Sequence, residues 1–130
     1  MREVRRLIAA VVLSFLACPT PVARAWVTWV SHAEMTASDY QTKFDFYATN
    51  GYRLVCISGY SQASQERYAA IWEQREGPPW RAAHGMTAMD LQIAVEDNIP
   101  EGFWLKWLNS YEVAGEDRYG HFEHIPAPAG

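Results

Sequence analysis

The sequence predicts an α+β domain built from two tandem helix–strand–strand repeats of about 50 residues, with antiparallel hairpins. Three observations predict this fold. The segment MTASDYQ, which begins at Met35, recurs 51 residues later as MTAMDLQ. A stretch with helical periodicity follows each copy. After a glycine, each helical stretch gives way to two stretches in which apolar and polar residues alternate, as in a hairpin.

The first 25 residues are expected to lie outside this domain. MREVRR is a basic start, LIAAVVLSFLA is an uncharged apolar run, and Ala23-Arg24-Ala25 has the pattern of a cleavage site. This order is typical of a secretory signal peptide, and the apolar run is too short to span a bilayer comfortably. We therefore interpret residues 1–25 as a signal peptide and residues 26–130 as one domain of a secreted or periplasmic protein.

Charge and cysteine content narrow the classes of partner. Without residues 1–25, which include four Arg and one Glu, the formal net charge is −7. An acidic surface repels phosphate backbones, so no nucleic acid is expected as a partner. Cys56 then remains as a lone cysteine, without an internal disulfide. Because Cys56 lies in the apolar run YRLVCIS, we expect a small buried residue rather than a thiol for intermolecular pairing.

The repeat extends well beyond the heptad. Aligning residues 29–73 with 80–124 without a gap gives 12 identical pairs among 45, and the repeats are assigned to 29–79 and 80–124. Residues that recur in register are expected to serve the architecture rather than a ligand. The pairs singled out are Trp29 and Trp80, Thr36 and Thr87, Asp39 and Asp90, Gly51 and Gly102, and Arg67 and Arg118.

Each recurring heptad reads as a helix start. Thr36 is a good N-cap, and Asp39 three residues later can reach back to it in a variant of the capping box. Thr87 and Asp90 repeat the device. The first helix should end at the Asn-Gly pair at 50–51, which tolerates left-handed backbone, and the second near position 98.

The strands that follow should bury one face by alternation. In GYRLVCISGY this core face would hold Tyr52, Leu54, Cys56 and Tyr60; in GFWLKWLNSY it would hold Phe103, Leu105, Trp107 and Tyr111. The segments RYAAIWEQRE and RYGHFEH are read as the returning strands. WVTWV is read as a short lead-in, and GPPW as a break before the second unit.

The second unit departs from the first at apolar positions. Glu123, His121 and Lys106 stand where the first unit has Trp72, Ala70 and Val55. Because terminal repeats carry a polar outer face, the second unit is interpreted as a cap. Two units form only a small core, so a homodimer stays an alternative to a monomer.

The sequence resembles the bacterial tandem repeat domain family, which is similar to the N-terminal repeats of fungal polyglycine hydrolases. The matching segments are GYR, SGY, RYAAIWE, GP, Trp80 and HGMT, within residues 29–124. The resemblance implies a non-catalytic repeat, because hydrolase activity in that family belongs to a separate serine β-lactamase-like domain. The chain contains neither Ser-x-x-Lys nor Gly-x-Ser-x-Gly, so polyglycine hydrolysis is not transferred to it.

Few residues suggest a site. Trp104, Trp107 and Tyr111 are the candidate binding residues, and Trp104 is the best of them because it should lie on the strand face opposite the core face. His121 and His124 are expected on a solvated edge, since their spacing does not suit zinc. His32 and His84 should bond nearby backbone, and salt bridges should join Arg67 to Asp39 and Arg118 to Asp90. No catalytic residue, metal or cofactor is predicted.

The function expected is therefore that of an exported, non-enzymatic repeat module that binds a protein or the cell envelope. Two alternatives stay open. One is a carbohydrate-binding module that uses exposed aromatic side chains. The other is an accessory or remnant repeat of a polyglycine-hydrolase-like serine hydrolase.

Overall fold

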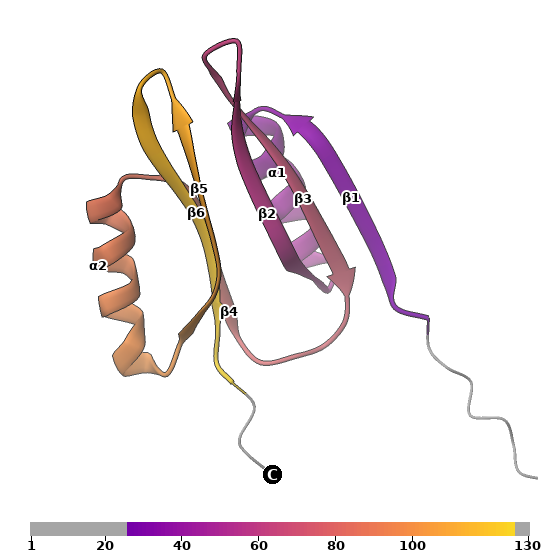
Figure 1. Ribbon diagram of the computed structural model, residues 1–130. Helices are drawn as coiled ribbons and strands as arrows, with labels where there is room; N and C mark the ends of the chain where they lie inside the picture. The colour runs from indigo at the N-terminus through magenta and orange to yellow at the C-terminus, as the bar shows by residue number, and fades with distance from the viewer. Residues whose placement is uncertain (1–25, 127–130) are drawn as a thin grey trace, which may run out of the picture.

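The chain forms two consecutive units, each with the order strand, helix, strand, strand (Figure 1). The computed structural model describes residues 26–126, so the proposed signal peptide lies outside the described residues. Unit one contains β1 (Thr28–Met35), α1 (Ala37–Thr49), β2 (Tyr52–Gln62) and β3 (Gln65–Gln74). Unit two contains β4 (Trp80–Met86), α2 (Ala88–Asn98), the 3-10 turn η1 (Ile99–Glu101), β5 (Trp104–Val113) and β6 (Glu116–His124).

Each unit has a three-stranded antiparallel sheet with its last strand in the middle. The orders are β1-β3-β2 in unit one and β4-β6-β5 in unit two. The α+β class and the two tandem repeats are therefore confirmed. The strands β1 and β4 were not predicted, because their sequences TWVSHAEM and WRAAHGM do not alternate apolar and polar residues regularly. Neither helix in residues 26–126 is both long and apolar enough to cross a membrane.

Both predicted helix starts are confirmed. The Thr36 hydroxyl oxygen accepts a bond from the Asp39 N–H at 3.1 Å, and the Asp39 carboxylate accepts from the Thr36 N–H at 3.3 Å. Thr87 and Asp90 form the same capping box. The first helix ends at its predicted Asn-Gly pair, where the glycine has φ +81°. The twice-written heptad is thus a local folding signal.

The predicted core faces of β2 and β5 are wrong beyond their first few residues. Val55 is an extra residue in β2, because Leu54 pairs with Trp72 and Cys56 pairs with Ile71. A bulge of this kind moves every later side chain to the other face of the sheet. Unit two has the same irregularity at Lys106. Alternation read from the sequence could not detect it.

Each sheet has a helix-side face, which its own helix covers, and an outer face on the other side, and the bulge decides which side chains of β2 and β5 lie on each. The helix-side face of unit one carries the core residues that lie over or beside α1: Leu54, Ile57, Gly59, Tyr68, Ala70 and Trp72. The outer face of unit two carries Trp107, Asn109, Tyr111, Gly120 and Phe122.

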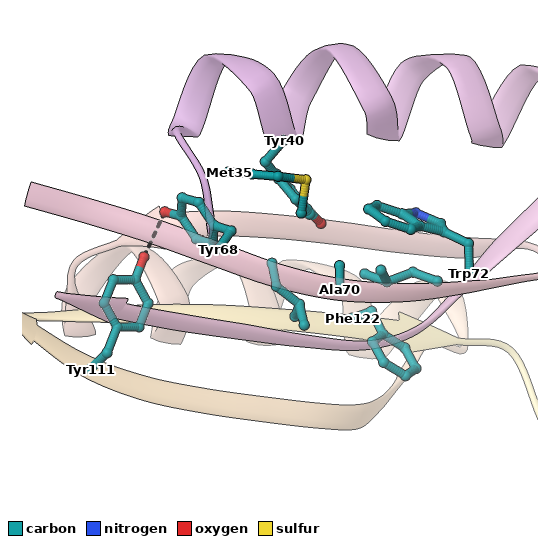
Figure 2. Close-up of a cluster of buried hydrophobic side chains, with 9 residues drawn as sticks. Met35, Tyr40, Tyr68, Ala70, Trp72, Tyr111 and Phe122 are labelled. Carbon is teal, nitrogen blue, oxygen red and sulfur yellow. Dashed lines mark hydrogen bonds between the residues drawn. The ribbon is translucent and has the colours of Figure 1, made fainter. Parts of the chain in front are cut away.

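One hydrophobic core holds the two units together. Tyr111 and Phe122 of unit two belong to the same buried cluster as Tyr68 and Trp72 of unit one (Figure 2). The outer face of the second sheet therefore packs on the helix-side face of the first, beside α1. The helix α2 lies on the other side of the second sheet, away from unit one (Figure 1). The units stack in one direction rather than face each other symmetrically.

Candidate functional site

The contact between the two units is made at a sheet edge. β2 is an edge strand, so part of its backbone has no strand partner. The indole N–H of Trp107 donates to the Ile57 carbonyl at 2.8 Å, and the Gly59 N–H donates to the Asn109 side-chain oxygen at 2.6 Å. Side chains of β5 thus satisfy the exposed edge of β2 without extending the sheet, and unpaired edge groups would otherwise need water or a partner.

A buried polar cluster joins the units beside this edge. The Glu66 carboxylate accepts hydrogen bonds from the hydroxyls of Tyr68 and, at 2.5 Å, of Tyr111, and these two hydroxyls lie 2.7 Å apart. Burial raises the pKa of Tyr111 to about 12 and also raises the pKa of Tyr68. Both phenols therefore stay protonated at neutral pH. The His84 ring of unit two packs edge-on against the Tyr68 ring, with the two ring centroids 5.0 Å apart.

The three candidate binding residues do not lie as the sequence predicted. Trp104, Trp107 and Tyr111 share the outer face of β5, because they pair with His124, Phe122 and Arg118. Tyr111 is buried and the Trp107 indole N–H is bonded to unit one, so both serve the contact between units. Ligand binding by Tyr111 and by Trp107, which is 41% exposed, stays a prediction. Trp104 is 69% exposed at the margin of that face and remains available.

Two recurring pairs also have surroundings that the sequence did not predict. Arg67 donates to the Gln65 side chain at 2.7 Å and to the backbone of Glu66, rather than to Asp39. Arg118 likewise pairs with Glu116, so the expected salt bridges to the helices are wrong. Each arginine thus bonds to the residues one and two positions before it in its own strand.

The recurring tryptophans differ in burial, because within the described residues only Trp80 lies against another unit. Trp80 is half-buried, with its ring edge-on to Phe44 of α1 at 5.4 Å. Trp29 is 63% exposed, so the two recurring tryptophans are not packed alike. Position 29 would meet the helix of a preceding unit, and the described part of the chain contains none.

The interpretation of unit two as a polar cap is wrong. His121 and Glu123 are only 2% and 1% exposed, and they lie on the face of β6 that α2 covers. The Asn98 side chain donates to the Glu123 carboxylate at 2.7 Å, and the His121 ring lies 3.7 Å from the same carboxylate. Burial lowers the pKa of His121. A solvated edge at His121 is therefore also ruled out.

Two of the other histidines and the cysteine have ordinary packing roles. His32 bonds the Tyr47 hydroxyl at 2.7 Å rather than backbone. His84 packs against the rings of Tyr40 and Tyr68. Cys56 is half-buried, less than expected, and burial raises the pKa of its thiol. Within residues 26–126, no three His, Cys, Asp or Glu side chains are grouped to hold a metal ion.

A cleft of ≈ 410 Å³ opens between the two units. Its basic lining residues are Arg53, Arg75 and Lys106, with His124 beside them. The guanidinium of Arg53 lies 5.8 Å from the centre of the Trp80 ring. Burial, together with the positive charge of Arg75, lowers the pKa of Arg53. Arg75 is paired with Glu73 at 3.1 Å. Arg53 and Lys106 have no ion pair within the described residues, so the cleft favours an anionic ligand over a cationic one.

The two-unit stack agrees with a comparison against known families. The model of the family described as polyglycine hydrolase-like, structural repeat, matches the chain twice, at residues 26–75 and 77–120. The chain belongs to this family. The two matches correspond to the two units, including the strands β1 and β4 that alternation alone missed, and the second match ends within β6.

As polyglycine hydrolase-like repeats, the two units can be compared position by position. Leu54 and Ile57 on the helix-side face of unit one are 3% and 1% exposed, because unit two covers them. Their counterparts in unit two, Leu105 and Leu108, are 43% and 48% exposed. The helix-side part of β5 formed by Leu105, Leu108 and Ser110 is called the open face below. Sequence comparison could have found it, since both leucines keep the apolar character of the first unit.

Proposed function

We propose that this polyglycine hydrolase-like repeat protein is an exported, non-catalytic module that binds another protein through its open face. The observation that carries the proposal is the contrast between the buried pair Leu54 and Ile57 and the exposed pair Leu105 and Leu108. The same surface that receives a neighbour in unit one is apolar and uncovered in unit two.

The energetics favour a protein partner at this surface. Fully burying a leucine stabilises by roughly 1.5–3 kcal/mol, so covering two half-exposed leucines contributes about 2 kcal/mol. β5 is also the edge strand of its sheet, which offers backbone groups for hydrogen bonding. Apolar side chains next to an unpaired strand edge are the features that a protein partner can satisfy together.

The absence of catalysis is proposed from the surroundings of the titratable groups. The half-buried Glu66 is bonded to two tyrosines that are buried between the units, and the His121 and Glu123 pair is enclosed under α2. None of these groups faces the cleft with a nucleophile beside it, as acid–base or nucleophilic catalysis requires. Export is proposed from the signal-peptide pattern of residues 1–25, and N-terminal sequencing of protein recovered from outside the cytoplasm should begin at Trp26.

Photo-cross-linking tests the binding site. The full chain with benzoylphenylalanine at position 108 should give a discrete protein adduct in the producing cells. The same probe at Phe46, an exposed position on α1, should not. Leu105→Glu should abolish the adduct from position 108. Adducts of equal yield from both positions, or none from position 108, would refute the proposed face.

A second candidate function is supported by the cleft. Arg53, Arg75 and Lys106 line the cleft together with Trp80. Trp104 is exposed on the outer face of unit two, the face that also carries Trp80. Cationic side chains beside aromatic rings suit an acidic polysaccharide of the cell envelope. Retention on immobilised polygalacturonate that is lost in Arg53→Ala and Trp104→Ala would support this function. Unchanged elution of these variants would exclude the cleft as the binding site.

A further inference from the structure

We infer that the open face receives a further repeat unit of the same family, supplied by another polypeptide, and that the first unit of this chain is not a matching occupant. The inference rests on the proposed function, whose binding face it uses. Its basis is the one unit-to-unit contact that the structure shows, in which unit two occupies the equivalent face of unit one.

The receiving surface is largely preserved in unit two. Leu105 and Leu108 stand at the positions of Leu54 and Ile57, and both sheets have the bulge one residue after the first of these. By this register, the Leu108 carbonyl and the Ser110 N–H lie where the Ile57 carbonyl and Gly59 N–H lie in unit one. No side chain in the part of the chain that the structure describes bonds to these two groups.

The occupying surface is not preserved in unit one. Trp107 and Asn109 supply the bonds to the edge of β2, and their counterparts in unit one are Cys56 and Ser58. A thiol is a weak donor compared with an indole N–H, and a serine side chain is shorter than that of asparagine. The outer face of unit one therefore lacks the groups that hold unit two in place.

A steric difference at the receiving face points the same way. Gly59 faces the ring of Tyr111, and a Cβ at position 59 would lie 2.2 Å from a ring carbon. Unit two has Ser110 at the matching position, and unit one presents Tyr60 as the matching ring. A second copy of this chain would thus place a tyrosine ring against the Ser110 side chain. The matching occupant has an N–H donor, an amide and a small residue at these three positions.

A pair of designed variants tests the inference with this chain alone. The receiver variant is Ser110→Gly, which restores room at the open face. The donor variant carries Cys56→Trp and Ser58→Asn, which restore the bonding groups on unit one. Sedimentation of an equimolar mixture should show a 1:1 complex of twice the monomer mass. The wild-type chain and each variant alone should sediment as monomers, and circular dichroism should confirm that each is folded.

Two controls define the contact. Pairing the donor with the wild-type chain, which keeps Ser110, should weaken the association at least tenfold. Adding Leu108→Glu to the receiver should abolish it. Folded donor and receiver chains that do not associate would overturn the inference, and so would wild-type chains that associate through the open face as a homodimer.

The failure of this inference can be told apart from failure of the proposed function. If the adduct from position 108 contains a protein without such a repeat, the repeat-unit partner is overturned while binding through the open face stands. If position 108 gives no adduct but donor and receiver associate, the inference about the fitting surface stands, and the proposed function in the cell fails.

Discussion

Gly59 on β2 lies directly against the ring of Tyr111 on β5, with room for no side chain between them. A Cβ at position 59 would lie 2.2 Å from the ring carbon Cε1, well inside van der Waals contact. Beside this contact, the Gly59 N–H is bonded to Asn109 and the Tyr111 hydroxyl to Glu66. The backbone of unit one therefore approaches unit two closely at the same place where hydrogen bonds join the two units.

Gly59→Ala should lower the free energy of unfolding by about 2 kcal/mol, because the added methyl group must displace the Tyr111 ring. Urea denaturation of the wild type and the variant measures the loss. Gly120→Ala is the matched control, since a Cβ there meets its nearest neighbour at 3.6 Å, an ordinary contact. Equal losses in the two variants would contradict the tight contact between the units.

Equivalent positions in the two repeats should respond differently to truncation. Ile57→Ala should cost about 2–4 kcal/mol, because it leaves a cavity under unit two. Leu108→Ala should cost less than about 1 kcal/mol, because its side chain is half-exposed. Thermal and urea unfolding of both variants provide the comparison. A large loss from Leu108→Ala would show that the open face is covered within the monomer.

The two capping boxes should contribute about equally. Thr36→Ala and Thr87→Ala each remove a side-chain acceptor from a first-turn N–H, which costs about 1 kcal/mol. Thr42→Ala is the control, because Thr42 lies in the exposed middle of α1. Urea midpoints at constant slope give the differences. A loss in Thr42→Ala as large as that in Thr36→Ala would mean that the caps add nothing specific.

These helix starts could be predicted because a capping box depends on residues three apart in the sequence. The faces of the strands could not, because the bulges at Val55 and Lys106 appear only in the pairing with the neighbouring strand. One extra residue in each strand put Trp107 on the face opposite to Leu105. The resulting error placed Trp104 and Trp107 on different faces, although they share one.

The burial of polar residues was equally hidden from the sequence. Replacement of Trp72 by Glu123 suggested a solvated end, but Asn98 supplies a hydrogen bond to the carboxylate inside the unit. The change at Cys56 and Trp107 was visible in the alignment. Its meaning became clear only when the structure showed that the Trp107 indole N–H bonds the neighbouring repeat.

Stability should fall as the pH is lowered below about 6.5. Burial lowers the pKa of His121 in the folded state, so between its folded pKa and the ordinary value of 6.5 the unfolded chain binds more protons. The loss begins near 6.5 and is complete below the folded pKa. The nearby Glu123 carboxylate opposes this shift but is the smaller influence.

Urea unfolding at pH values of about 7.5, 6.5, 5.5 and 5.0, which span the range in which histidine titrates, measures this dependence. His121→Ala, which copies Ala70 of unit one, should flatten part of the slope. His32 and His84 also have lowered pKa values, so some slope should remain. If the variant and the wild type have the same slope, His121 is not protonated on unfolding in this range.

Amide hydrogen exchange at Gly59 and Ser110, followed by NMR in one sample, compares the occupied edge with the open one. The Gly59 N–H is bonded to Asn109 and should exchange slowly, at a rate limited by separation of the units. The Ser110 N–H, its counterpart on the open edge of β5, should exchange at close to the rate of an unprotected amide. Protection of Ser110 equal to that of Gly59 in the monomer would contradict a stack that is occupied in unit one and open in unit two.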